Sequence, residues 1–107
     1  MAFDPSKDHS ISLKEASKLT KRYRDDRGSS KEPIAGAFGH KAFKDILEQK
    51  DCVGIRVYYA KDDNKNLTTV LVGIDSNGND LYEGRLMEWS GLCPPLCGED
   101  NPLNADV

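Results

Sequence analysis

The sequence predicts an α+β fold in which two helices pack on one face of a small, mostly antiparallel sheet of three to four strands. Three observations lead to this prediction: a capped amphipathic segment near the N-terminus, an alternating apolar segment in the middle, and an Asn-Gly turn between two further strand patterns. The chain has 107 residues, of which 37% are hydrophobic and 31% are charged. This composition is typical of one small domain with a strongly solvated surface.

The first helix is expected to begin directly after Ser12. Ser12 and Glu15 form a capping box, in which the serine oxygen accepts a hydrogen bond from the backbone amide of Glu15. Four side chains then follow at helical spacing and make one amphipathic stripe: Ala16, Leu19, Thr20 and Tyr23. The helix is expected to fray over residues 24–27 and to end by Gly28.

A short strand and a second helix are expected next. Residues 34–38 form an apolar segment that fits a strand, although Gly36 weakens it. The second helix is expected over residues 41–49. One face carries Phe43, Ile46, Leu47 and Lys50, and of these Phe43 and Leu47 are predicted to anchor the helix in the core.

Three strands are expected to form a meander in the second half of the chain. Residues 52–60 alternate, and one predicted buried face is made of Val53, Ile55, Val57 and Tyr59. Residues 67–74 are expected to form the next strand, and because they are apolar on both sides from Val70 to Ile74 they fit a central strand. The Asn-Gly pair at 77–78 fits a type I′ hairpin turn. A return strand is expected after it over residues 80–83, with an extension to Leu86 left open.

The sequence divides into three parts. A flexible leader is expected over residues 1–9, a single α+β domain over residues 10–90, and a tail that contains proline and cysteine over residues 91–107. The sequence contains neither a signal-peptide pattern nor an apolar run of the ~20 residues that span a bilayer. The odd number of cysteines, three, agrees with a reducing compartment. A cytoplasmic protein without a membrane partner is therefore predicted.

Cys93 and Cys97 flank Pro94 and Pro95 in the tail. In an extended polyproline conformation the cysteine α-carbons would lie about 12 Å apart, whereas a disulfide needs less than roughly 7 Å. A disulfide would therefore require a turn. A tetrahedral metal would need two more ligands, and the candidates are scattered without motif spacing: Cys52, His9 and His40. A disulfide, a metal pair and two free thiols all stay open, and no metal ligand set or other cofactor is predicted.

The sequence gives little support to enzymatic activity, and no catalytic residue is predicted. The segments beginning at Asp62 and Asp75 superficially resemble calcium loops, but neither has the glycine that an EF-hand needs at its sixth position. The chain has no glycine-rich phosphate loop and no nucleophile elbow.

A basic face on the first helix is interpreted as solvated surface. Its residues are Lys14, Lys18, Lys21 and Arg22. The isoelectric point of about 5.3 lies far below the value above about 9 that is common in nucleic-acid-binding domains. The sequence therefore argues against a nucleic-acid partner.

Three segments give the chain a recognisable layout. They are a Val-Gly-Ile-Arg-Val-Tyr strand, a Leu-Val-Gly-Ile-Asp-Ser-Asn-Gly-Asn-Asp hairpin, and an ending with Cys-Pro-Pro-Leu-Cys and Asn-Pro-Leu. This layout resembles the small uncharacterised proteins common in Bacteroidetes genomes. The resemblance covers nearly the whole chain, and it implies no particular activity.

The function predicted from these observations is a non-enzymatic protein-interaction or homo-oligomerising module. An open meander leaves sheet edges that another segment or protein must cover. The residues expected to take part in such contacts are Trp89, Pro94 and Pro95. The alternative is a thiol-redox or metal-responsive protein that uses Cys93 and Cys97.

Overall fold

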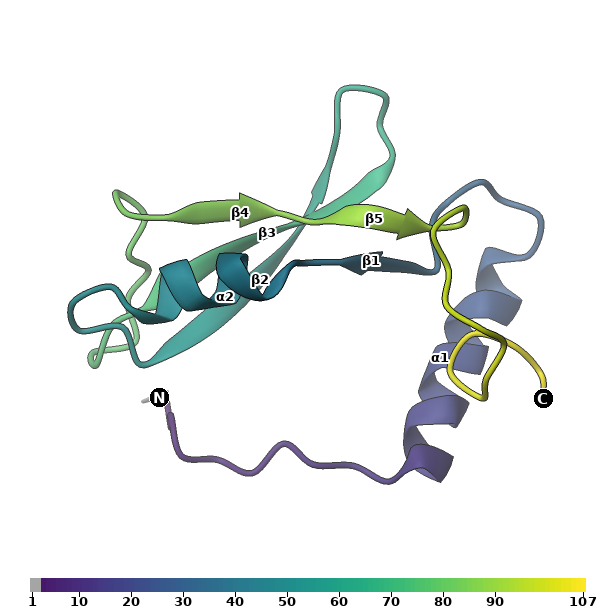
Figure 1. Cartoon of the computed structure of the whole chain (residues 1–107), viewed down its shortest axis with the longest axis horizontal. Helices are drawn as coiled ribbons and strands as arrows, with labels where there is room; N and C mark the ends of the chain where they lie inside the picture. The colour runs from purple at the N-terminus through teal and green to yellow at the C-terminus, as the bar shows by residue number, and fades with distance from the viewer. Residues whose placement is uncertain (1–2) are drawn as a thin grey trace. The chain divides into compact units, whose positions relative to one another are not determined.

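The computed structural model describes residues 3–107 and confirms the predicted α+β class (Figure 1). Within these residues the elements are α1 (Leu13–Arg27), β1 (Ala35–Ala37), α2 (His40–Leu47), β2 (Gly54–Lys61), β3 (Leu67–Ile74), β4 (Leu86–Glu88) and β5 (Ser90–Cys93). The strands form two sheets, one with the order β2-β3-β4 and one that pairs β1 with β5. In the described part of the chain, no helix is long and apolar enough to cross a membrane.

The described chain divides into two compact units. The sheet unit contains residues 3–7 and Ala37–Ser90, and the helix unit contains Asp8–Gly36 and Gly91–Val107. The division into a leader, a domain and a tail stays a prediction, and the first two leader residues lie outside the described residues.

The core of the sheet unit lies around β3. This strand pairs antiparallel with β2 on one side and with β4 on the other, and Leu71, Val72 and Ile74 are at most 3% exposed. The prediction of a central strand over residues 67–74 is therefore confirmed, with the same bounds.

The residue of α2 that is fully buried is Ile46, at 0% exposure. The prediction that Phe43 and Leu47 anchor this helix was wrong, since their side chains are 41% and 49% exposed. A helix of eight residues makes only about two turns. Only the middle of its apolar face is covered by the strands it contacts, β2 and β3.

The predicted buried face of β2 is covered at its beginning and open at its end. Val57 and Tyr59 are 51% and 85% exposed, so the prediction was wrong for these two residues. These two side chains are exposed because α2 is shorter than β2. Eight helical residues span about 12 Å, whereas eight strand residues span about 27 Å. The helix is too short to cover the strand that it packs against.

The return strand predicted over residues 80–83 is absent from the described residues. Only Asp80 forms a bridge, to Ile74, and the strand β4 begins later. Gln49 explains the difference, because its side-chain amide donates to the carbonyl of Ile46 (2.9 Å) and accepts from the backbone N–H of Arg85 (2.7 Å). This amide holds the segment as a loop against the end of α2, and a Cβ at Gly84 would overlap it.

Two five-residue turns, 62–66 and 75–79, share one geometry. In each, the first and fifth residues are joined by an N–H to carbonyl hydrogen bond of 2.9 Å, and the aspartate at the first position accepts from the amides of the third and fifth. The fourth residue has a positive φ, 65° at Lys65 and 83° at Gly78. The type I′ prediction was wrong, because in the second turn only Gly78 has a positive φ. The aspartate carboxylate organises the turn instead.

The shared geometry makes Lys65→Gly a stabilising substitution. A non-glycine residue with left-handed backbone costs about 1–2 kcal/mol, and glycine loses about 0.4–1 kcal/mol more conformational freedom on folding. The net gain expected is about 0.5–1 kcal/mol, measured as the free energy of unfolding in urea. Gly78→Ala, at the equivalent position, should lose stability. A loss of stability in Lys65→Gly would contradict the assignment of strain.

Candidate functional site

The tail cysteines come together in the structure. Cys93 and Cys97 form a disulfide with their α-carbons 4.7 Å apart. The chain makes the turn that the sequence required, with the N–H of Leu96 bonded to the carbonyl of Leu92 (2.9 Å). Cys93 is buried and Cys97 is exposed, as are the two prolines between them, whose preceding peptide bonds are both cis.

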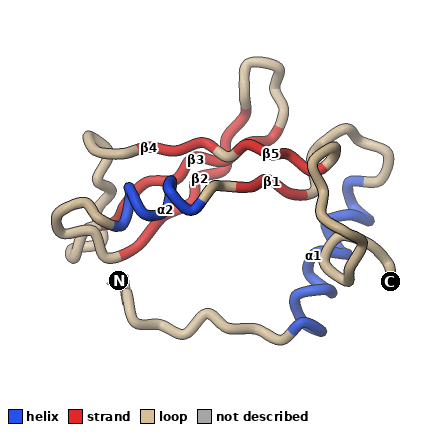
Figure 2. The backbone as a smooth tube through the Cα atoms, viewed as in Figure 1, coloured by secondary structure: helices blue, strands red, loops and turns tan. Residues whose placement is uncertain are grey.

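The residues after the disulfide form a compact turn, which we call the knob (residues 101–106). Figure 2 shows it inside the long irregular stretch that follows β5. Asn101 organises the knob, because its side-chain oxygen accepts from Leu103 (2.8 Å) and its carbonyl accepts from Asn104 and Ala105 (3.1 and 3.0 Å). The side-chain oxygen of Asn104 accepts a hydrogen bond from the backbone N–H of Asn101 (2.9 Å). Side chains of the knob therefore fix its shape.

The knob contacts α1 within the helix unit. Arg24 donates to the carbonyl of Leu103 (2.8 Å) and to the carboxylate of Asp106 (2.8 Å), and Lys21 lies 3.4 Å from the same carboxylate. The hydrogen bond from Arg24, followed by that from Lys21, lowers the pKa of Asp106 below its ordinary value. Sequence reasoning missed this contact. The available signals were the Asn101-Pro102 turn and one acidic residue that could face a basic helix.

α1 begins where the sequence predicts. The backbone amide of Glu15 donates to the Ser12 hydroxyl (3.1 Å), and Gly28 ends the helix with a positive φ of 55°. None of the side chains on this helix is buried. Leu19 and Tyr23, which lie on the predicted stripe, therefore remain largely accessible.

A second polar cluster lies in the sheet unit, on β2. Arg56 and Tyr58 both donate to the carboxylate of Asp80, and Arg56 also reaches the carbonyl of Gly78 (3.3 Å). The hydrogen bond from Tyr58 is the main cause that lowers the pKa of Asp80, and the same bond raises the pKa of Tyr58. The cluster ties β2 to the turn after β3.

Trp89 lies next to β3 rather than in the open. Its backbone N–H donates to the carbonyl of Thr69 (3.4 Å), and the indole nitrogen is buried. Neither this nitrogen nor the Thr69 hydroxyl finds a hydrogen-bond partner among residues 3–107. The role of Trp89 in partner contacts stays a prediction.

The remaining metal candidates are not brought together. Among the described residues, no three His, Cys, Asp or Glu side chains lie close enough to share an ion. Cys52 is half-buried, and its thiol donates to the carbonyl of Gly54 (3.3 Å).

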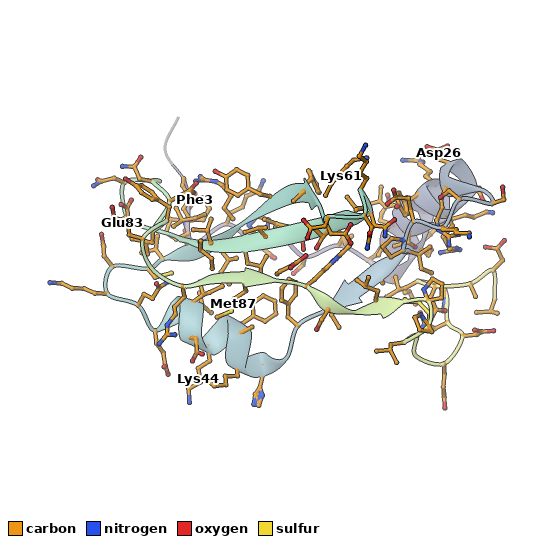
Figure 3. All side chains as sticks on the ribbon, turned by 90° about the horizontal axis from the view of Figure 1, so that it is seen from above. Phe3, Asp26, Lys44, Lys61, Glu83 and Met87 are labelled. Carbon is orange, nitrogen blue, oxygen red and sulfur yellow. A yellow bond between two sulfur atoms is a disulfide. The ribbon has the colours of Figure 1, made fainter. Side chains whose placement is uncertain are left out.

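One edge of the three-stranded sheet is β2, a strand of eight residues. Its three consecutive apolar and aromatic residues are all strongly exposed: Val57, Tyr58 and Tyr59. Figure 3 shows the last residue, Lys61, pointing away from the ribbon. A long, exposed edge strand is a template for pairing with another chain.

Comparisons with protein-family models, curated proteins and solved structures find no match to this chain. The resemblance to small Bacteroidetes proteins therefore stays a prediction, and any function must be argued from the geometry of this chain.

The cluster on β2 predicts a specific pH dependence. Because the pKa of Asp80 is lowered from its ordinary value of 3.8, its pairing stabilises the fold above that pH and is lost as the pH falls through the lower, folded value. Tyr58→Phe removes the largest cause, so the pKa of Asp80 should rise, and the acid-side loss of stability should become smaller. NMR titration of the carboxyl carbon measures this. Tyr59→Phe is the matched control, and an unchanged Asp80 pKa in Tyr58→Phe would contradict the assignment.

Proposed function

We propose that this chain is a non-enzymatic protein-interaction module that associates with a second copy of itself through the edge strand β2. The observation that carries this proposal is the exposed run of Val57, Tyr58 and Tyr59 on a strand that pairs on one edge only among residues 3–107. The cytoplasmic location predicted from the sequence is part of the same proposal.

The backbone of β2 has N–H and C=O groups on the side away from β3 that can pair with another strand. Asp62, just past the strand, donates its N–H to the carbonyl of Asn66 (2.9 Å). Because antiparallel ladders alternate, the even-numbered residues of β2 point their backbone groups toward β3 and the odd-numbered residues point theirs away. The outward groups belong to Ile55, Val57, Tyr59 and Lys61. A paired strand would satisfy these groups and cover the exposed side chains.

A second copy fits this edge because the strand is complementary to itself. When two copies pair antiparallel about Tyr58, Val57 of each lies opposite Tyr59 of the other on one face. On the opposite face, the same register places Tyr58 of one copy against Tyr58 of the other. Such an isologous contact closes as a dimer and leaves no further edge of this kind.

Tyr59→Lys tests the proposed dimer. A lysine at each of the two symmetric positions should weaken association by about tenfold or more, because it places a hydrated charge where an aromatic ring was buried. Sedimentation velocity over a range of protein concentrations measures the dimerisation constant.

Tyr82→Lys is the matched control, since Tyr82 is 70% exposed and lies outside β2. It should dimerise like the unchanged protein. A protein that stays monomeric at every concentration, or a control as disruptive as Tyr59→Lys, would overturn the proposal.

A thiol-disulfide switch is the second candidate, and the paired cysteines of the tail favour it. Their disulfide spans a sequence separation of only four residues. So short a loop gains little from chain entropy, and a disulfide in a reducing compartment is more often regulatory than structural. Reduction by a dithiol would add two electrons and two protons to give the Cys93 and Cys97 thiols, while the dithiol becomes a disulfide.

The switch predicts that oxidation orders the tail. Limited proteolysis in oxidised and reduced dithiothreitol should cut residues 98–107 several-fold more slowly in the oxidised protein. The Cys93→Ser/Cys97→Ser variant should be cut at the fast rate in both conditions. Cys52→Ser should behave like the unchanged protein. If the double variant resists protease as well as the oxidised protein does, the disulfide has no control over the tail.

A further inference from the structure

We infer that the surface of α1 is a binding site for short acidic peptides, and that the knob occupies it as an internal ligand. The inference concerns the helix unit alone and does not depend on association through β2.

The site is a groove with an apolar part and a basic part. The apolar part has a volume of about 220 Å³ and is lined by Leu19, Thr20, Tyr23, Arg24, Ile34 and Leu103. The basic part has a volume of about 300 Å³ and lies between α1 and the end of the chain: α1 contributes Ser17, Lys18, Lys21 and Arg24, and the opposite wall is made of Pro102, Ala105, Asp106 and Val107. Arg24 belongs to both parts, so the two form a continuous surface along the helix.

The groove is built to receive a chain. The Arg24 side chain is only 15% exposed and is directed at two groups of the knob, the Leu103 carbonyl and the Asp106 carboxylate. Lys21 supplies a second positive charge to the same carboxylate. One backbone carbonyl, one apolar side chain and one carboxylate are therefore recognised together, which is what a peptide-binding site does.

The knob has the properties of a ligand. Its hydrogen bonds are made mostly within residues 99–105, so its shape does not require α1. It presents Leu103 to the apolar part and Asp106, three residues later, to the basic part. A peptide with the same spacing of a leucine and a carboxylate would make the same contacts.

The knob is docked in a way that allows exchange. Asp106 keeps 67% of its side-chain surface exposed, and Leu103 is also exposed. The contact between Lys21 and Asp106 joins two exposed charges 3.4 Å apart, and such contacts are weak and screened by salt. The knob stays against α1 chiefly because its attachment to the chain gives it a high effective concentration. An acidic peptide in solution competes once that advantage is removed.

The experiment uses the full chain and a labelled synthetic peptide of residues 99–107. The Leu103→Ala/Asp106→Ala variant, called the released variant, weakens the docking of the knob by removing its apolar side chain and its carboxylate, and it leaves only the hydrogen bond from Arg24 to the backbone carbonyl of residue 103. Fluorescence anisotropy should show the peptide binding this variant at least tenfold more tightly than the unchanged protein, in which the knob competes. Raising the salt concentration should weaken the binding. Circular dichroism confirms that the variant remains folded.

Two controls identify the contacts. A peptide with the D106K change should bind the released variant at least tenfold more weakly than the parent peptide. Adding Arg24→Glu to the released variant should abolish binding of the parent peptide and restore binding of the D106K peptide. No binding by the folded, released variant at millimolar peptide would overturn the inference. Equal binding of the parent and D106K peptides would also overturn the inference, because it would show that binding does not depend on the Asp106 carboxylate.

Discussion

The structure of the sheet unit depends on the burial of one strand by very few partners. β3 supplies most of the core side chains, and its two faces are covered by a helix of two turns and by neighbouring segments. Because α2 covers only about half the length of β2, the far end of that strand stays open. Because α2 is short, few side chains are buried in the core, and the side chains at the far end of β2, where association is proposed, remain exposed. The small size of the core and the exposure of the proposed association surface therefore both follow from the short length of α2.

Short polar side chains shape the loops throughout the chain. The Asp62 and Asp75 side chains each accept hydrogen bonds from two backbone amides of their own turn, and the Asn101 side chain accepts one in the knob. A side chain that satisfies nearby amides replaces the hydrogen bonds that a helix or strand would supply. These loops thus hold defined shapes with little buried apolar surface. This explains how a chain with few buried residues can still present the knob to α1 in one orientation.

Local signals in the sequence were sufficient for the elements that depend on local physics. The Ser12 cap and the apolar segment from Val70 to Ile74 in β3 depend on neighbours within a few residues, and both were found from the sequence. The failures involve partners far along the chain. Gln49 bonds to Arg85 across 36 positions, and no pattern near residue 80 reveals that the segment will be held as a loop. Burial of Ile46 in place of Phe43 likewise depends on how far a sheet extends beneath the helix.

The candidate sites follow the same rule. The cysteine pair was recognisable because the proline geometry could be worked out within five residues, including the need for a turn. The contact of Arg24 with Asp106 spans 82 positions and could not be found from a basic stripe alone. The two proposed surfaces also differ in their physics, since the β2 edge offers apolar rings and backbone groups whereas α1 offers charge. Salt weakens the second kind of contact and has little effect on the first. Ionic strength therefore separates the two kinds of association in a single preparation.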